Sequence, residues 1–244
     1  MRRFTLRPER LVGGRVTFDA DESHHLARVL RLRPGDTVVA TDGAGRDYTV
    51  RLEEVGATAT GTVLAAAAGP RESPLALTLV QGIPKGDRME TIVRAAAELG
   101  AARVLPALCE RKVVRLEASR WRERARRWQR VAREAAKQCG RAVVPEVEIP
   151  RPLADWLAAA EGVDLALCPW EGGGAPLVAT LAAAGAPRSA LVLVGPEGGL
   201  AAAEVEAARA RGLTVVSLGP RILRTETAGP ALLAILQSRF GDLG

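Results

Sequence analysis

Two loops near the carboxyl end of the chain carry the residue types best suited to binding a ligand. The apolar run 191–194 ends in Gly-Pro-Glu-Gly-Gly at 195–199. The apolar run 215–218 ends in Gly219, and Pro-Arg-Ile-Leu-Arg-Thr-Glu-Thr-Ala follows at 220–228. Glycine has no Cβ, so backbone at these positions can approach a ligand closely. In an open α/β sheet, ligands bind beyond the carboxyl ends of neighbouring strands. We therefore predict that the two runs are neighbouring strands whose loops form one site.

Motifs of several other chemistries are absent from the sequence. There is no G-x-x-x-x-G-K-[ST] loop and no G-x-G-x-x-G at the first strand-to-helix turn. G-x-S-x-G and H-E-x-x-H are also missing. Cys109, Cys139 and Cys168 lie far apart without a C-x-x-C pair, so we expect reduced, buried thiols. His24 and His25 cannot hold a metal alone, and no metal site is expected.

The positive charge of the chain is concentrated in one segment. The net charge is +6, but residues 103–141 alone carry +9, against +1 for 1–102 and −4 for 142–244. Nearly all of these positive charges are arginine, whose guanidinium binds phosphate through two hydrogen bonds. Such a patch indicates a nucleic-acid partner. The alternative is a solvated helix face in a chain that uses arginine in place of lysine.

Length and hydropathy bound the class of protein. The chain has 244 residues, of which 48% are hydrophobic, enough for one or two domains with a real core. No apolar run reaches the length of a membrane span, and the basic N-terminus is not followed by an apolar signal core. We expect a cytoplasmic protein that does not enter a membrane.

The first part of the chain reads as β-rich. Short strands are predicted at 15–18, 37–41, 47–52 and 60–64, with a hairpin turn at Asp42-Gly43. Ser23 is the expected N-cap of a helix over 23–31. Short strands with tight turns are typical of a small barrel. We place this domain at 1–70 and a linker at 71–74.

From residue 75 to 244 the pattern alternates between strand and helix. Strands are predicted at 75–81, 103–108, 144–149, 163–168, 190–194 and 214–218. A helix is predicted at 89–99, with Gly100 as its C-cap. A second is predicted at 119–138, where Trp121 and Trp128 share one face and should pack on the core. This alternation indicates an α/β domain with a mostly parallel sheet.

Eight segments, taken in order, carry a resemblance to a known family. They are His24–Leu32, 35–36, 42–43, 81–90, 98–100, 134–141, 195–199 and 223–228. With them the chain resembles the SPOUT superfamily of S-adenosylmethionine-dependent RNA methyltransferases, and within it the small-subunit ribosomal RNA uridine-N3-methyltransferases. One departure is Gly229-Pro230, where the family continues an alanine-leucine helix. If Thr227 is the N-cap, Pro230 falls in the first turn and costs little.

The resemblance implies a fold, a reaction and partners. It implies a trefoil-knotted parallel sheet behind a PUA-like β-barrel that binds RNA, and a homodimer. The expected reaction is methylation of N3 of a uridine in 16S ribosomal RNA, within an assembled or assembling small subunit. S-adenosylmethionine would be the methyl donor and S-adenosylhomocysteine the product.

On this resemblance the two carboxyl-end loops supply the cofactor pocket. Apolar side chains would form a slot for adenine, and glycines would leave backbone donors and acceptors open. The expected cofactor-binding residues are Val194, Gly195, Pro196, Gly198, Gly199, Leu218, Gly219, Ile222, Leu223, Arg224 and Thr227. The alternative for the glycines is tight turns alone.

Two residues of these loops are the catalytic candidates. The uracil N3 must be aligned with the methyl group, and its proton removed or the developing negative charge stabilised. Glu197 is the candidate base or orienter, and Arg224 the candidate for electrostatic stabilisation. The alternatives are a structural carboxylate that accepts loop N–H groups and an ion pair of Arg224 with Glu226 or a partner subunit.

Basic residues outside these loops are the candidates for contacts with RNA phosphates. They are Arg2, Arg3, His24, His25, Arg28, Arg31, Lys85, Arg88, Arg111, Arg115 and Arg141. For those of the first domain, the alternative is a solvated surface with a packed histidine. Two other functions stay open: ribose 2′-O-methylation, and a non-catalytic RNA-binding or ribosome-assembly factor with the same fold.

Overall fold

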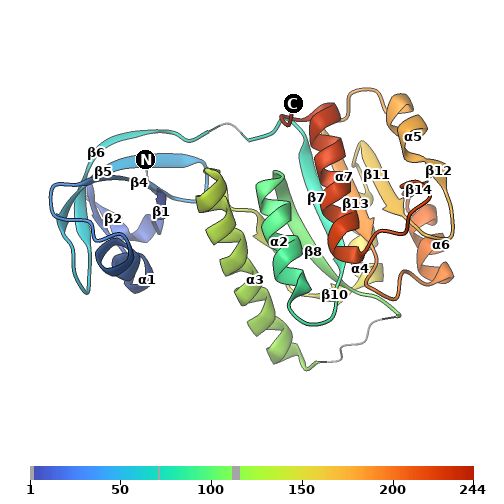
Figure 1. Ribbon diagram of the computed structural model, residues 1–244, viewed down its shortest axis with the longest axis horizontal. Helices are drawn as coiled ribbons and strands as arrows, with labels where there is room; N and C mark the ends of the chain where they lie inside the picture. Colours follow the sequence, from blue (N-terminus) through green and yellow to red (C-terminus); the bar gives the residue numbers. More distant parts are fainter. Residues whose placement is uncertain (1–2, 71, 112–115) are drawn as a thin grey trace. The chain divides into compact units, whose positions relative to one another are not determined.

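The computed structural model describes residues 3–70, 72–111 and 116–244, and these form two compact units (Figure 1). One unit comprises Met1–Glu72 together with Arg133–Val144, and the other Ser73–Ala132 together with Pro145–Gly244. The predicted boundaries place 133–144 in the second domain, whereas in the structure this stretch belongs to the first unit.

The first unit is a six-stranded sheet around its own core. Its strands are β1 (Arg3–Thr5), β2 (Leu11–Val12), β3 (Arg15–Thr17), β4 (Thr37–Thr41), β5 (Arg46–Glu54) and β6 (Thr60–Ala68), in the order β1-β4-β5-β6-β3-β2. β1 and β4 pair in parallel, and the other neighbours pair antiparallel. Phe4, Phe18 and Leu26 are buried in the core. The predicted strands and the hairpin after β4 are confirmed.

The short helix of this unit starts earlier than its sequence suggests. A 3₁₀ turn, η1 (Pro8–Arg10), precedes it; α1 covers Ala20–His24 and continues into a π-helical turn, η2 (His25–Val29). Asp19 is the N-cap, and its side chain accepts the N–H of Glu22 at 2.9 Å. The prediction that Ser23 is the cap is therefore wrong. Ser23 is buried, where its hydroxyl accepts the N–H of Ala59 and donates to Phe18 O.

Two ionic contacts explain why the stretch 133–144 belongs to the first unit. Lys137 donates to Glu22 at 2.7 Å, and the two side chains are only 8% and 6% exposed. Arg141 contacts the carboxylate of Glu72. Removing one partner of a buried pair leaves a charge without compensation, so these pairs fix the stretch in place.

The second unit is an eight-stranded parallel sheet, which confirms the predicted α/β class. Its strands are β7 (Ala76–Gly82), β8 (Ala101–Leu108), β9 (Glu146–Val147), β10 (Arg151–Pro152), β11 (Leu165–Pro169), β12 (Ala175–Pro176), β13 (Ser189–Val194) and β14 (Thr214–Ser217). The order is β10-β8-β7-β13-β11-β14-β12, and β9 pairs with β8. The strand predicted at 144–149 is therefore reduced to two residues.

The helices of the second unit are α2 (Arg88–Glu98), α4 (Leu153–Leu157) with the 3₁₀ turn η3 (Ala158–Ala160), α5 (Leu177–Ala183), α6 (Ala202–Ala210) and α7 (Thr225–Phe240). The long helix α3 (Ala118–Cys139) begins in this unit, and its end, from Arg133, belongs to the first unit. α4 and α6 share a core with Leu191 and Leu193 of β13. Side chains alternate along a strand, so Val194 points to the other face, where α7 packs beside α2 (Figure 1).

The strand order corrects one prediction that bears on the site. The sequence pattern predicts that β13 and β14 are neighbours, but β11 lies between them and pairs with both. Because all three strands are parallel, their carboxyl ends meet at one edge of the sheet. Three loops, rather than two, therefore converge there.

The burial of single tryptophan and cysteine residues tests further expectations. Trp121 and Trp128 are buried, as predicted. Cys109 and Cys168 are buried thiols, also as predicted, whereas Cys139 at the end of α3 is exposed. Among the described residues, no helix combines the length and the apolar character that a membrane crossing needs.

Candidate functional site

A cleft of about 660 Å³ opens in the second unit at the carboxyl ends of β13, β11 and β14. Three chain segments form its walls: 169–171 after β11, 194–200 after β13, and 217–226 after β14. Arg88 and Ala228 complete the lining. The cleft thus lies where a doubly wound sheet is expected to bind a ligand.

The structure brings together all but one of the predicted cofactor-binding residues. Val194, Gly195, Pro196, Gly198, Gly199, Leu218, Gly219, Ile222, Leu223 and Arg224 line the cleft, and so does Glu197. Thr227 is not among the lining residues. The slot is also more open than expected, because Ile222 is 83% exposed while Val194 is buried.

Thr227 lies inside α7, which begins earlier in the chain than the sequence predicts. Arg224 is its N-cap and Thr225 its first residue. The expectation that Thr227 caps this helix is therefore wrong, and Pro230 is its sixth residue rather than part of the first turn. A proline there removes an intrahelical hydrogen bond.

The segment 169–171 is the part of the site that sequence reasoning missed. Glu171 lies directly against the backbone of Gly199: a Cβ at that glycine would be 2.2 Å from Glu171 Oε1. Gly199 has φ +68°, a conformation that side-chain-bearing residues rarely adopt. The available signal was the end of the strand predicted at 163–168, whose carboxyl end faces the same edge.

A buried hydrogen-bond cluster ties two walls of the cleft together. The hydroxyl of Thr225 donates to Gly195 O at 2.6 Å and accepts from Gln81 Nε2 at 2.9 Å. Gln81 is fully buried at the end of β7, and its Nε2 also donates to Gly82 O at 2.9 Å. The loop after β13 is thereby fixed to the start of α7.

Replacing Thr225 by valine should lower the free energy of unfolding by about 1–3 kcal/mol, because Gly195 O and Gln81 Nε2 each lose one hydrogen bond. Valine has nearly the same shape, so packing changes little. Thr225→Ser keeps the hydroxyl and should restore most of the stability, as measured by urea unfolding. Equal losses in both variants would show that the methyl group, not the hydrogen bond, matters.

Glu197 is held by the loop that follows β7. Its Oε1 accepts the backbone N–H of Lys85 at 2.9 Å and pairs with Arg88 Nη1 at 2.5 Å. Burial acts to raise the pKa of Glu197. Hydrogen bonds from its own N–H and that of Lys85, together with the guanidinium of Arg88, outweigh this effect, so the pKa lies below its ordinary value. These contacts match the structural alternative for this carboxylate.

The arginines of the cleft differ in how far their charge is compensated. Arg88 is predicted to contact RNA, but it pairs with Glu197 and lies 3.8 Å from Glu226. Glu226 is thus taken up by Arg88 and not by Arg224, against one alternative for Arg224. Within the described residues Arg224 has no carboxylate partner, and its side chain is exposed at the cleft wall.

The predicted RNA contacts of the first unit divide into engaged and open side chains. Arg3 pairs with Asp47 and donates to Arg141 O, so it is only 15% exposed. His25 packs edge-on against Phe4, which agrees with the alternative of a packed histidine. His24, Arg28 and Arg31 are exposed at the surface.

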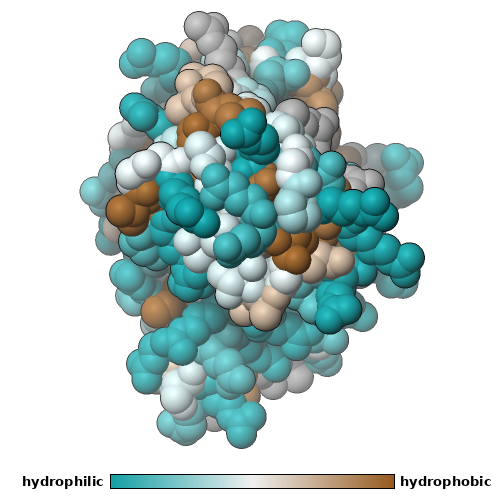
Figure 2. Space-filling model, turned by 90° about the vertical axis from the view of Figure 1, so that its left-hand side faces the viewer, coloured by the Kyte–Doolittle hydropathy of each residue, from teal (hydrophilic) through white to brown (hydrophobic). Residues whose placement is uncertain are grey.

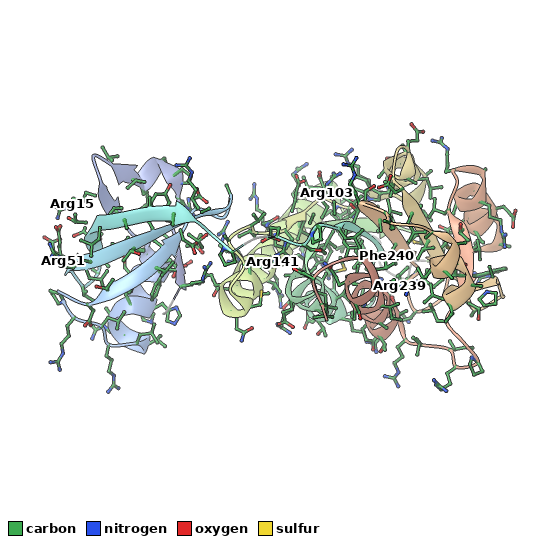
Figure 3. The ribbon with its side chains drawn as sticks, turned by 90° about the horizontal axis from the view of Figure 1, so that it is seen from above. Arg15, Arg51, Arg103, Arg141, Arg239 and Phe240 are labelled. Carbon is green, nitrogen blue, oxygen red and sulfur yellow. The ribbon has the colours of Figure 1, made fainter. Side chains whose placement is uncertain are left out.

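Figure 2 looks onto the surface of this first unit, where the hydrophobic colour is confined to separate small areas. The exposed large hydrophobics of this unit are Val12, Val29 and Leu64. Figure 3 labels two further basic residues of the unit, Arg15 and Arg51, which flank Thr62 of β6 on either side. The face shown in Figure 2 is mostly polar.

The other predicted RNA contacts have varied surroundings. Lys85 has an exposed side chain. Arg111 donates to Gly198 O at 3.2 Å and therefore supports the glycine-rich loop. Arg141 is bound to Glu72 within the first unit. Arg2 and Arg115 lie outside the described residues.

Two family models match this chain. One, described as an RNA methyltransferase domain, matches residues 71–237. The other, described as an RNA methyltransferase PUA domain, matches residues 18–59. The first covers the whole cleft, and the second lies within the first unit.

Individual relatives agree with these models. The chain is 34% identical to ribosomal RNA small subunit methyltransferase E of Synechocystis sp., covering 95% of this chain and 76% of that protein. It is 32% identical to the Bacillus subtilis protein of the same name, covering 85% of this chain and 84% of that protein. A crystal structure of the Neisseria gonorrhoeae protein of that name, bound to S-adenosyl methionine, is 33% identical, covers all of both chains and has a TM-score of 0.90.

Proposed function

We propose that this chain, which belongs to the RNA methyltransferase family, transfers a methyl group from S-adenosylmethionine to small-subunit ribosomal RNA. The observation that carries the proposal is the cleft at the ends of β13, β11 and β14, lined by Gly195, Gly198 and Gly199. The match to a Neisseria gonorrhoeae structure that is bound to S-adenosyl methionine supports the same ligand for this cleft.

The residues of the cleft fit this cofactor. Backbone of the 195–199 loop comes close to the cleft, and a Cβ at Gly195 would meet Leu200 N at 3.0 Å. Val194 and Leu223 supply apolar surface, and the main chain of the glycines supplies donors and acceptors for a nucleoside. When bound, the cofactor would supply an electrophilic methyl group. The residues of the chain must then hold the acceptor atom of the base in line with the methyl group and the sulfur, and must allow the base to lose its proton.

We assign the acceptor atom as N3 of a uridine, on the family resemblance of the sequence. Methylation at N3 requires that the imide loses its proton and that negative charge on the carbonyl oxygens is stabilised. Arg224 is suited to the second task, because it lies at the cleft wall and no carboxylate among the described residues pairs with it. Glu197 is the candidate for orientation. A carboxylate whose pKa is lowered is a weaker base, so we assign it to the placement of Arg88 and the Lys85 loop.

The substitution Glu197→Gln separates these roles. If Glu197 only orients other groups, the Glu197→Gln variant should keep kcat at pH 7 within about fivefold of the wild-type value. Its affinity for S-adenosylmethionine should fall, because an amide cannot form the ion pair with Arg88. A kcat loss of about a hundredfold or more at normal cofactor affinity would instead identify a base.

The pH dependence gives a second measure of the same carboxylate. Because the folded pKa is lowered, the contact with Arg88 contributes fully above the ordinary carboxyl range and is lost only as the pH falls through the lowered pKa. Cofactor affinity between pH 6 and 8 should therefore show no titration from Glu197. A titration in that range that disappears in Glu197→Gln would contradict this assignment.

We further propose that the first unit binds RNA through His24, Arg28 and Arg31. We also propose that the chain acts as a homodimer in the cytoplasm and that the sheet of its second unit is knotted. The proposal of a knot rests on the family resemblance, and the position of β13 between β7 and β11 and the packing of α7 on α2 agree with it. The exposed histidine and arginines of the first unit support the RNA contact.

Mass spectrometry of nucleosides tests the function directly. Small-subunit RNA is incubated with the protein and isotopically labelled S-adenosylmethionine and is then digested to nucleosides. Label in N3-methyluridine is the expected result. Label in a 2′-O-methylated nucleoside would move the assignment to the ribose. Calorimetry showing no cofactor binding would favour a non-catalytic RNA-binding factor.

A further inference from the structure

The long helix α3 has a row of arginines that form no ion pair with the described residues of their unit. Arg122, Arg126 and Arg130 are exposed and follow each other at intervals of four residues. Four residues advance a helix by about 6 Å and slightly exceed one turn, so the three side chains project from one flank. We call these three residues the α3 arginine row. The opposite face of the helix is buried through Trp121, Ala125 and Trp128.

The row differs from the other flank of the same helix in its ionic contacts. Arg127 pairs with Glu90 of α2 at 2.5 Å and lies 3.8 Å from Asp87, and Arg124 stacks over Trp121. For the three residues of the row, no carboxylate of the described chain lies within ion-pair distance. The row therefore carries positive charge that the described part of its own unit does not balance.

Several other arginines of the second unit do have carboxylate partners. Arg103, labelled in Figure 3, pairs with Glu146 and Glu148, Arg209 pairs with Glu206, and Arg211 with Glu161. Exposed arginines of this unit can thus find a carboxylate neighbour, even in a chain that is rich in arginine. Arg94, Arg188 and Arg221 are also exposed and form no ion pair with a carboxylate of the described residues, but they stand singly. The row is distinguished by three such arginines on a single helix flank, which favours a partner from outside the unit.

We propose that the α3 arginine row binds the phosphate backbone of the RNA substrate. The row presents one guanidinium about every 6 Å in a line, a spacing comparable with that of successive phosphates along an extended RNA strand. Guanidinium groups bind phosphate oxygens through two parallel hydrogen bonds. The row lies outside the cleft and reads no base, so its contribution is affinity and placement of the strand. This inference rests on the proposed function in that the partner is RNA.

The salt dependence of RNA binding tests the row. The triple variant R122A/R126A/R130A and the wild type are titrated with a fluorescent single-stranded fragment of small-subunit RNA over a range of salt concentrations, without methyl donor. Each lost phosphate contact lowers the salt slope by about 0.7 for a single strand. The expected result is a slope smaller by about 2 and an affinity at least about tenfold weaker at about 0.1 M salt.

The triple variant R103A/R209A/R211A is the matched control. It removes the same number of charges from the same unit, at the exposed Arg209 and Arg211 and the half-buried Arg103, but from arginines that already have carboxylate partners. Its slope should stay close to that of the wild type. Equal slopes in both triple variants would show that total charge, not the row, governs binding and would overturn the proposal.

Two further readouts separate RNA binding from folding and from subunit assembly. Thermal unfolding and S-adenosylmethionine affinity should be unchanged in the row variant, because the row does not line the cleft. A change of oligomeric state in light scattering would identify the row as a subunit contact and overturn the RNA assignment. If the wild type binds the fragment with the expected slopes but methylates no RNA, the proposed reaction fails while the row remains an RNA-binding surface.

Discussion

Replacing Gly82 by alanine should cost the protein at least about tenfold in affinity for S-adenosylmethionine, although residue 82 does not line the cleft. Gly82 is buried at the end of β7, beside the loop that follows β13. An added Cβ would lie 2.6 Å from both N and Cδ of Pro196 and 2.8 Å from Gly195 C. These atoms belong to backbone and a proline ring, which cannot rotate away.

The physical reason is that one methyl group must displace a whole loop. Pushing the 195–199 loop away from β7 also strains the hydrogen bonds of Gln81 and Thr225 to Gly195. Overpacking of this kind costs about 1–3 kcal/mol in stability. A tenfold loss of affinity corresponds to about 1.4 kcal/mol, so both effects have the same origin and size.

Gly56→Ala is the control for this prediction. A Cβ at Gly56 meets nothing within 4 Å, and its φ is not in the left-handed region. Calorimetry should therefore give wild-type cofactor affinity for Gly56→Ala and a weakened one for Gly82→Ala. Full affinity in Gly82→Ala would show that the loop after β13 moves freely and that its tie to β7 does not shape the cleft.

The glycine loops and the strands were predictable from local pattern. Apolar runs such as 191–194 alternate with helical segments, and their carboxyl ends in a parallel sheet are a known place for ligands. The sequence does not contain the order of the strands. That β11 separates β13 from β14 depends on which crossover each helix makes, so Glu171 could not be assigned to the site.

Two other differences have a tertiary cause. The start of α7 is set by the buried hydroxyl of Thr225, which bonds to Gly195 and Gln81 in distant segments. The end of α3 belongs to the first unit because Lys137 pairs with Glu22, 115 residues away. Neither pairing leaves a signal in the local sequence, where Thr227 is as good a cap as any by residue type.

Removing the charge of Arg224 is expected to have the largest effect on turnover. Arg224→Ala should lower kcat by about 10²–10³ with a smaller change in cofactor affinity, the size measured when one stabilising donor is lost from a transition state. The reason is that the positive charge of Arg224 is not balanced by a carboxylate of the described chain. Arg88 shares the cleft, but its charge is balanced by Glu197 and Glu226, whereas the described chain offers Arg224 no carboxylate.

The lysine variant separates charge from geometry at this position. Lysine keeps the positive charge but loses the planar fork of donors, so Arg224→Lys should recover part of the lost kcat if charge is what stabilises the uracil anion. Arg211→Ala removes an arginine that already pairs with Glu161 away from the cleft, and it should turn over normally. Single-turnover kinetics with saturating cofactor measures the three variants on one scale. Wild-type kcat in Arg224→Ala would exclude electrostatic stabilisation by this side chain and leave the negative charge to the backbone of the 217–226 segment.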